Sequence, residues 1–70
     1  MNRLKVIRAD QRVTQFKLGL MTGILQSRLS LIENGLIEPR EDEKNRIAMA
    51  LGVDPEKIWV KRTDAKEEKE

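Results

Sequence analysis

Hydrophobic residues recur at steps of three and four along most of this chain, which is the period of an amphipathic α-helix. No interior segment shows the regular alternation of apolar and polar residues that marks a half-buried strand. The pattern therefore predicts an all-α protein, a compact bundle of five helices. The helices are expected over about residues 2–11, 15–21, 26–33, 39–51 and 55–59.

Residues with strong local preferences set the predicted helix boundaries. Thr14 can cap the second helix through its hydroxyl, while Gly23 and Gly52 can adopt the left-handed conformation in which helices end. Pro39 and Pro55 are favourable in a first helical turn. We therefore expect the fourth and fifth helices to begin at these two prolines.

The middle of the chain has the spacing of two short helices joined by a sharp turn. Gly19 would allow the two helix axes to approach closely, and Gly23 would form the turn between them. Leu25, Leu29 and Ile32 follow at positions i, i+4 and i+7, which predicts one buried stripe on the third helix. These features together indicate a helix-turn-helix unit.

The opposite face of this third helix is expected to be exposed. It carries mainly small hydrogen-bonding side chains, and Glu33 at its edge is its only carboxylate. The members of this face are Ser27, Ser30, Leu31 and Asn34, with Gln26 and Arg28 on its flanks. Such a face can lie against phosphates and base edges without charge repulsion, so we interpret it as a DNA-contacting surface.

Charge is distributed unevenly over the 70 residues, whose net charge is +2. Six basic and two acidic residues lie in residues 1–36, against eight and ten in residues 37–70. A basic front half suits a protein that presents one face to a polyanion. The length is that of one domain, so residues 1–60 are expected to fold and the charged residues 61–70 to form a flexible tail.

Cysteine and histidine are absent from the chain. This excludes a disulfide and a Cys/His zinc site, and it removes the usual nucleophile and general base. We therefore expect no metal, no cofactor and no enzymatic activity, and a single domain offers no evident site for a small-molecule effector. No apolar run has the length of a membrane span, about 18 residues, and no signal peptide is evident. A cytoplasmic location is expected.

The sequence resembles the phage repressor/Cro-type (XRE-type) helix-turn-helix family. The resemblance runs without gaps over residues 2–59 and rests on five segments, which are NRLKVIR, VTQ, TGI, QSRLSLIENG and IAMALGV. It implies a lambda-repressor-like bundle whose third helix enters the major groove of DNA. The protein would then be a prokaryotic or phage-derived transcriptional regulator associated with the nucleoid, with repression as the expected mode.

The resemblance also implies roles for individual residues. Base-reading positions are Gln26, Ser27, Ser30 and Leu31. Phosphate contacts are expected from Gln15, Lys17, Arg28, Asn34 and Arg40, and Gln15 would also brace Gln26. The amide of Gln26 suits a bidentate contact with adenine. Arg8 and Glu33 match a buried ion pair that joins the first helix to the end of the third.

One recognition helix reads only a few base pairs, so we expect a homodimer that binds inverted half-sites. Candidate interface residues are Leu36, Ile37, Ile58 and Val60, while Trp59 is expected to complete the core. Residues 60–63 are a candidate strand pairing across the two-fold axis.

An alternative function uses the same fold as a protein-interaction module or an antitoxin-type partner. Phe16, Leu31, Leu36 and Ile37 favour it, because they are more apolar than solvent or phosphate requires. The basic front half and the nearly acid-free face of the third helix favour DNA.

Overall fold

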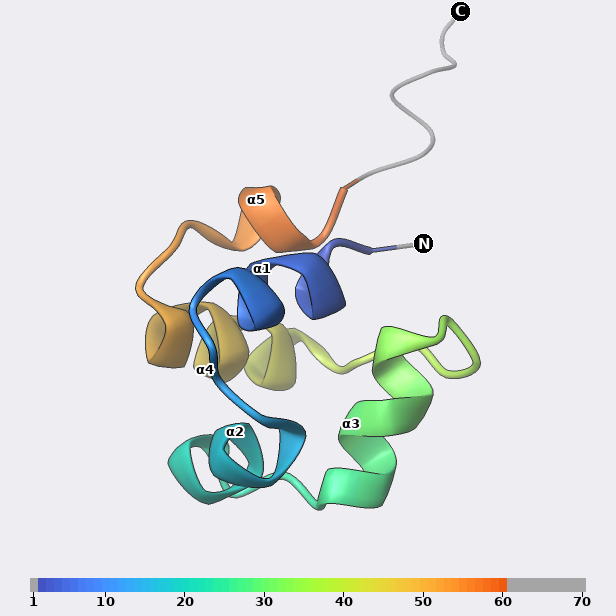
Figure 1. Cartoon of the computed structure of the whole chain (residues 1–70). Coiled ribbons are helices and arrows are strands. Elements are labelled where there is room, and N and C mark those ends of the chain that lie inside the picture. The colour runs from blue at the N-terminus through green and yellow to red at the C-terminus, as the bar shows by residue number, and fades with distance from the viewer. Residues whose placement is uncertain (1, 61–70) are drawn as a thin grey trace, which may run out of the picture.

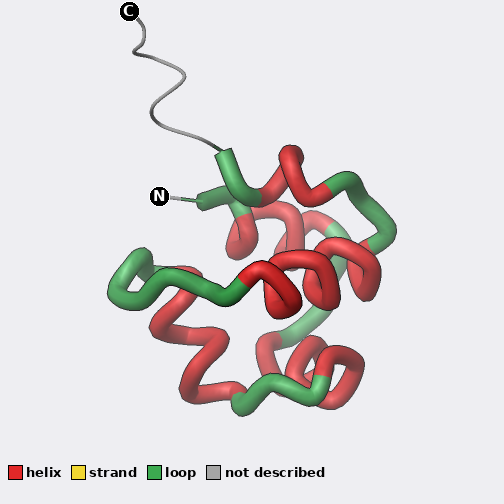
Figure 2. The backbone as a smooth tube through the Cα atoms, turned by 180° about the vertical axis from the view of Figure 1, so that it is seen from behind, coloured by secondary structure: helices red, strands yellow, loops and turns green. Residues whose placement is uncertain are grey.

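The computed structural model describes residues 2–60, which form five α-helices and no strand (Figures 1 and 2). The helices are α1 (Leu4–Asp10), α2 (Gln15–Thr22), α3 (Gln26–Glu33), α4 (Glu41–Leu51) and α5 (Pro55–Ile58). The predicted all-α class is thus confirmed. The expected tail at residues 61–70, and the strand beyond Val60, lie outside the described residues.

Two helices begin later than predicted, each for a local reason. α1 begins at Leu4 because the side-chain oxygen of Asn2 accepts the Leu4 backbone N–H at 3.0 Å and so caps the helix from outside. The expectation that α4 begins at Pro39 is wrong. Arg40 precedes α4 in an extended conformation, and the Glu43 carboxylate accepts its backbone N–H at 2.8 Å, which sets the first turn at Glu41.

α2 and α3 approach each other at a glycine and meet through a turn of residues 23–25. A Cβ atom on Gly19 would lie 2.9 Å from the Ile24 carbonyl oxygen, so a larger residue would force this turn away from α2. Gly23 adopts the left-handed conformation, with φ 78°. At the other end of α2, the Thr14 hydroxyl accepts the Lys17 backbone N–H at 3.0 Å. The predicted cap, close approach and turn are all present.

Buried aliphatic side chains from every helix form one core. Its members are Leu4, Leu18, Ile24, Leu29, Ile32, Ile47, Ala48, Leu51 and Ile58. α1 and α5 lie side by side across this core from α2 (Figure 1). The Arg3 backbone N–H donates to the Ile58 carbonyl at 2.9 Å, which joins the two ends of the described chain.

Two predictions about apolar residues are wrong. Leu25 does not belong to the buried stripe of α3: it is 75% exposed, because it precedes the helix in a non-helical conformation, and Ile24 fills the core instead. Ile58 is not available to a dimer interface, because its side chain is fully buried at the end of α5. Trp59 packs against the core, and its indole N–H donates to the Lys44 carbonyl at 3.2 Å.

Candidate nucleic-acid interface

The face of α3 that points away from the core matches the predicted one. Leu29 and Ile32 are fully buried against the other helices. The side chains on the opposite side are exposed at Gln26, Ser27 and Leu31 and half-buried at Ser30. Asn34 lies just beyond the helix, is exposed, and donates from its amide nitrogen to the Ser30 carbonyl at 2.9 Å. The four proposed base-reading residues therefore share one accessible surface.

The carboxylate of α3 does not reach this surface. Glu33 is buried, and the Arg8 guanidinium binds it through two hydrogen bonds, Nε to Oε2 at 2.5 Å and Nη2 to Oε1 at 3.1 Å. A third guanidinium nitrogen, Nη1, donates to the Val13 carbonyl at 2.8 Å. The ion pair expected from the sequence is thus present, and it connects α1, the segment before α2 and the end of α3. It neutralises the only acidic residue of the third helix.

Gln15 takes part in the same network. Its side-chain nitrogen donates to Glu33 Oε1 at 3.0 Å, so the amide at the start of α2 is oriented by α3. Among residues 2–60 no hydrogen bond joins Gln15 to Gln26, so the brace expected between them stays a prediction.

A second buried carboxylate, Glu43, binds Arg28 from α3. Arg28 Nε donates to Oε2 at 2.7 Å and Nη2 donates to Oε1 at 3.0 Å. The side chain of Glu43 is 4% exposed, so it requires a partner for its charge. Two of the three guanidinium nitrogens of Arg28 are therefore engaged within the chain. This does not favour the expected phosphate contact of Arg28, and it leaves Lys17 and Arg40 as the exposed cations of the predicted set.

This pairing changes the proton affinity of both groups. The hydrogen bond from Arg28 lowers the pKa of Glu43 from 4.5 to about 2, with a further contribution from the backbone N–H of Arg40, although burial acts in the opposite direction. The same hydrogen bond raises the pKa of Arg28. Both groups are therefore charged near neutral pH, and the pair holds α3 against the first turn of α4.

We expect Glu43→Gln to remove part of the acid sensitivity of folding. Because the folded-state pKa of Glu43 is lowered to about 2, its stabilising effect is complete above its ordinary pKa of 4.5 and is lost as pH falls from there toward 2. The variant should be less stable than the parent near pH 7, and the difference should shrink as the pH is lowered through this range. Urea titrations at several pH values measure it.

Asp42→Asn is the matched control for this prediction, since Asp42 lies in the same helical turn with an exposed carboxylate. Its stability difference from the parent should change less with pH. A difference for Glu43→Gln that stays constant from neutral to acid pH would contradict the role assigned to the carboxylate.

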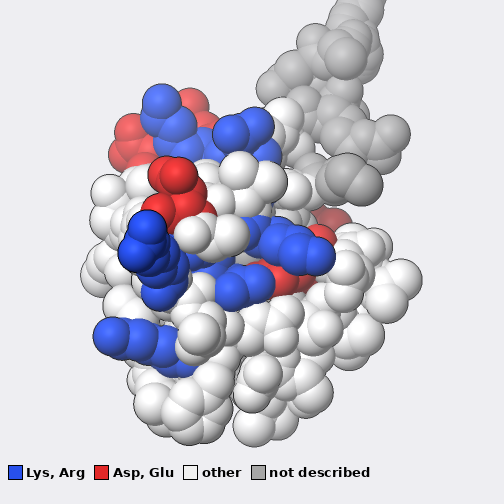
Figure 3. Space-filling view, in the orientation of Figure 1, with Lys and Arg blue, Asp and Glu red and all other residues white. Residues whose placement is uncertain are grey.

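The helices that carry the predicted contacts have few charges. Residues 14–32 contain two cations, Lys17 and Arg28, and no carboxylate. Figure 3 shows the consequence: the lower end of that view, where α2 and the beginning of α3 lie, is almost entirely uncharged. A surface of this kind offers hydrogen-bond donors and acceptors with little electrostatic repulsion toward a polyanion.

Three of the candidate dimer residues are accessible. Leu36 is 69% exposed in the loop after α3, and Ile37 beside it is half-buried and packs against the core. Val60, after α5, is exposed. These residues can contact a partner without opening the fold, which Ile58 cannot.

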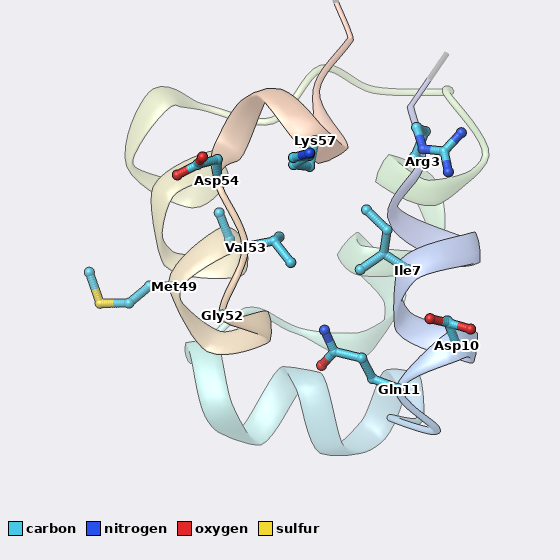
Figure 4. Close-up of a pocket in the computed structure, with 10 residues that line it drawn as sticks. Arg3, Ile7, Asp10, Gln11, Met49, Gly52, Val53, Asp54 and Lys57 are labelled. Carbon is cyan, nitrogen blue, oxygen red and sulfur yellow. The ribbon is translucent and has the colours of Figure 1, made fainter.

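An open groove runs between α1 and the segment from α4 to α5 (Figure 4). Ile7 and Val53 face each other across it, and the side-chain nitrogen of Gln11 donates to the Leu51 carbonyl at 2.7 Å. Charged side chains lie at its rim, among them Arg3, Asp10, Asp54 and Lys57. Within residues 2–60 there is no group of three or more acidic, His or Cys side chains placed to hold a metal ion.

None of the helices formed by residues 2–60 is long and apolar enough to cross a membrane. Comparison of the chain with protein-family models, with curated proteins and with solved structures finds no match.

Proposed function

We propose that this protein is a DNA-binding transcriptional regulator that reads its site through α3. In this proposal α2, the turn and α3 are a helix-turn-helix unit of the lambda-repressor-like type, and α3 lies in the major groove. Gln26, Ser27, Ser30 and Leu31 contact base edges. The phosphate groups are contacted mainly by Gln15, Lys17, Asn34 and Arg40.

One observation carries the proposal. Glu33, at the end of α3, and Glu43, which binds Arg28 of α3, are both buried, and each is bound by an arginine. The accessible face is left with amide, hydroxyl and apolar groups, the groups that read base edges in a groove. A helix that approaches phosphates gains from this burial, because an exposed carboxylate would repel them. The sequence resemblance to the repressor/Cro-type family supports the same function.

A selection from a random pool of double-stranded DNA tests the proposal. We expect one sequence family to be enriched, and binding to weaken with salt because phosphate contacts release counterions. With Lys17 and Arg40 as the exposed cations and Arg28 held by Glu43, the dependence should be shallow. It should correspond to roughly two to three phosphates per subunit at about 0.9 per phosphate. Anisotropy titrations between about 50 and 200 mM salt measure it.

Two results would count against this function. Affinity unchanged over the salt range would remove the phosphate contacts from the proposal. A selection that enriches no duplex would favour the alternative of a protein-interaction module, for which the exposed Leu31 and Leu36 are the supporting observation.

We propose further that the protein binds DNA as a symmetric dimer. Two half-sites about one helical turn apart, ~34 Å, would double the number of base pairs that are read. Leu36 and Val60 are exposed and Ile37 is partly so, which suits a self-complementary apolar patch. Sedimentation at micromolar concentration, with and without the selected duplex, should show a dimer. Ile37→Glu or Val60→Glu should dissociate it, and a monomer bound to a single half-site would contradict the proposal.

A further inference from the structure

α2 has a second, outward side whose apolar residues neither the core nor the proposed DNA contacts use. Leu18 and Thr22 are buried on the inner side of the helix. The residues that face solvent are Phe16, Lys17, Leu20 and Met21, which the helical period places on one side and which we call the α2 outer face. Its apolar members are widely accessible, Phe16 at 61% and Leu20 at 71%.

Neither DNA nor the folded domain accounts for the apolar side chains of this face. Phe16 and Leu20 have no hydrogen-bond donor for a phosphate oxygen. A phosphate backbone also does not offer the apolar surroundings into which such side chains leave water favourably. Both residues belong to α2 and lie four positions apart, so they form a continuous ridge. Contiguous exposed apolar side chains of this kind mark sites of interaction between proteins.

The sequence of residues 61–70 is poorly suited to covering the ridge. Residues 61–70, KRTDAKEEKE, contain one apolar residue, Ala65, so this segment has no side chain large enough to bury Phe16 or Leu20.

A second copy of the α2 outer face is also a poor partner. Around a two-fold axis each face meets itself, so the Lys17 ammonium group of each copy would be enclosed between apolar side chains. Residues 14–32 provide no carboxylate to pair with it. Asp42, in α4, is already bound to Arg46 at 3.0 Å. An enclosed ammonium group without a partner is costly, so self-association through this face is disfavoured.

We propose that the α2 outer face binds an amphipathic helix of another protein. The apolar row of that helix covers Phe16, Leu20 and Met21, and a carboxylate at its flank pairs with Lys17. As in other cases of amphipathic-helix recognition, the residues at i, i+3, i+4 and i+7 of the bound helix serve as its anchors. The charge of Lys17, amid apolar neighbours, is what selects an acidic partner over a basic one.

A displayed peptide library tests the proposal on the full chain without DNA, so its outcome does not depend on the proposed DNA binding. Every peptide carries leucines at i, i+3, i+4 and i+7 of a helix, and the flanking positions vary among Glu, Lys and Ser. We expect enrichment of Glu-flanked peptides. Phe16→Ser and Leu20→Ser should each lower the affinity for an enriched peptide by about tenfold or more, the usual effect of removing an interface anchor. Val6→Ser is the control, because Val6 is similarly exposed, at 58%, but lies on α1, outside this face.

Lys17→Glu is the sharpest variant, because it should reverse the preference from Glu-flanked to Lys-flanked peptides while leaving the apolar ridge intact. Thermal melts of all variants should remain close to the parent, since the substituted side chains are exposed. The proposal is overturned by a library without enrichment, by enriched peptides that bind Phe16→Ser and Leu20→Ser as well as the parent, or by a flank preference that Lys17→Glu does not change. Self-association of the parent that Leu20→Ser abolishes would also overturn it, by making a second copy the occupant.

Discussion

Arg8→Ala is expected to destabilise the protein by roughly 3–5 kcal/mol, the typical effect of removing one partner of a buried ion pair. The side chain of Glu33 is 2% exposed, so the substitution would leave a buried carboxyl group without the guanidinium that binds it. The Val13 carbonyl would lose its bond from Arg8 as well. In a domain of this size such a change lowers the melting temperature by roughly 12 °C or more. Thermal unfolding followed by circular dichroism measures it.

Arg3→Ala is the matched control, since Arg3 is an exposed arginine at the start of the same helix. Its removal should cost about 0–1 kcal/mol. Combining Arg8→Ala with Glu33→Gln should recover part of the lost stability, because no charge then stays buried. Equal melting temperatures for Arg8→Ala and Arg3→Ala would show that the ion pair contributes nothing to the fold.

Gln26→Ala is expected to relax the sequence preference of DNA binding. It should also reduce the free energy of binding to the preferred site by roughly 1–3 kcal/mol, the usual contribution of one bidentate base contact. The side chain is exposed at the first turn of α3, where it has no role in the core. Its loss should therefore affect recognition without lowering the melting temperature. Binding of the variant to every single-base substitution of the selected duplex locates the position at which discrimination is lost.

Lys17→Ala provides the contrast to this base-reading variant. A phosphate contact carries no sequence information. This substitution should therefore lower the affinity for all duplexes by about the same factor and reduce the salt dependence of binding. Arg40→Ala should behave in the same way. If Gln26→Ala leaves the sequence preference unchanged, Gln26 does not read a base and the assignment of the α3 face must be revised.

The local features of the fold follow from the sequence, because they depend on residues that are close along the chain. Thr14 caps α2 and Gly23 turns the chain, and both effects act over a few residues. The helical period likewise identifies Leu29 and Ile32 as buried, with Ser27 and Leu31 on the other side. The Arg8–Glu33 pair spans 25 residues, and it was expected only because the whole sequence resembles a known family.

Only the tertiary structure decided which of several equivalent residues is buried and which charges pair. Ile24 and Leu25 are adjacent and both apolar, but the turn after α2 directs the first into the core and the second to solvent. Arg28 has the sequence signature of an exposed cation, yet it binds Glu43, 15 residues away. Both outcomes depend on how the helices approach one another in space. Because a buried carboxylate without a partner is costly, each one pairs with the cation that helix packing places within reach.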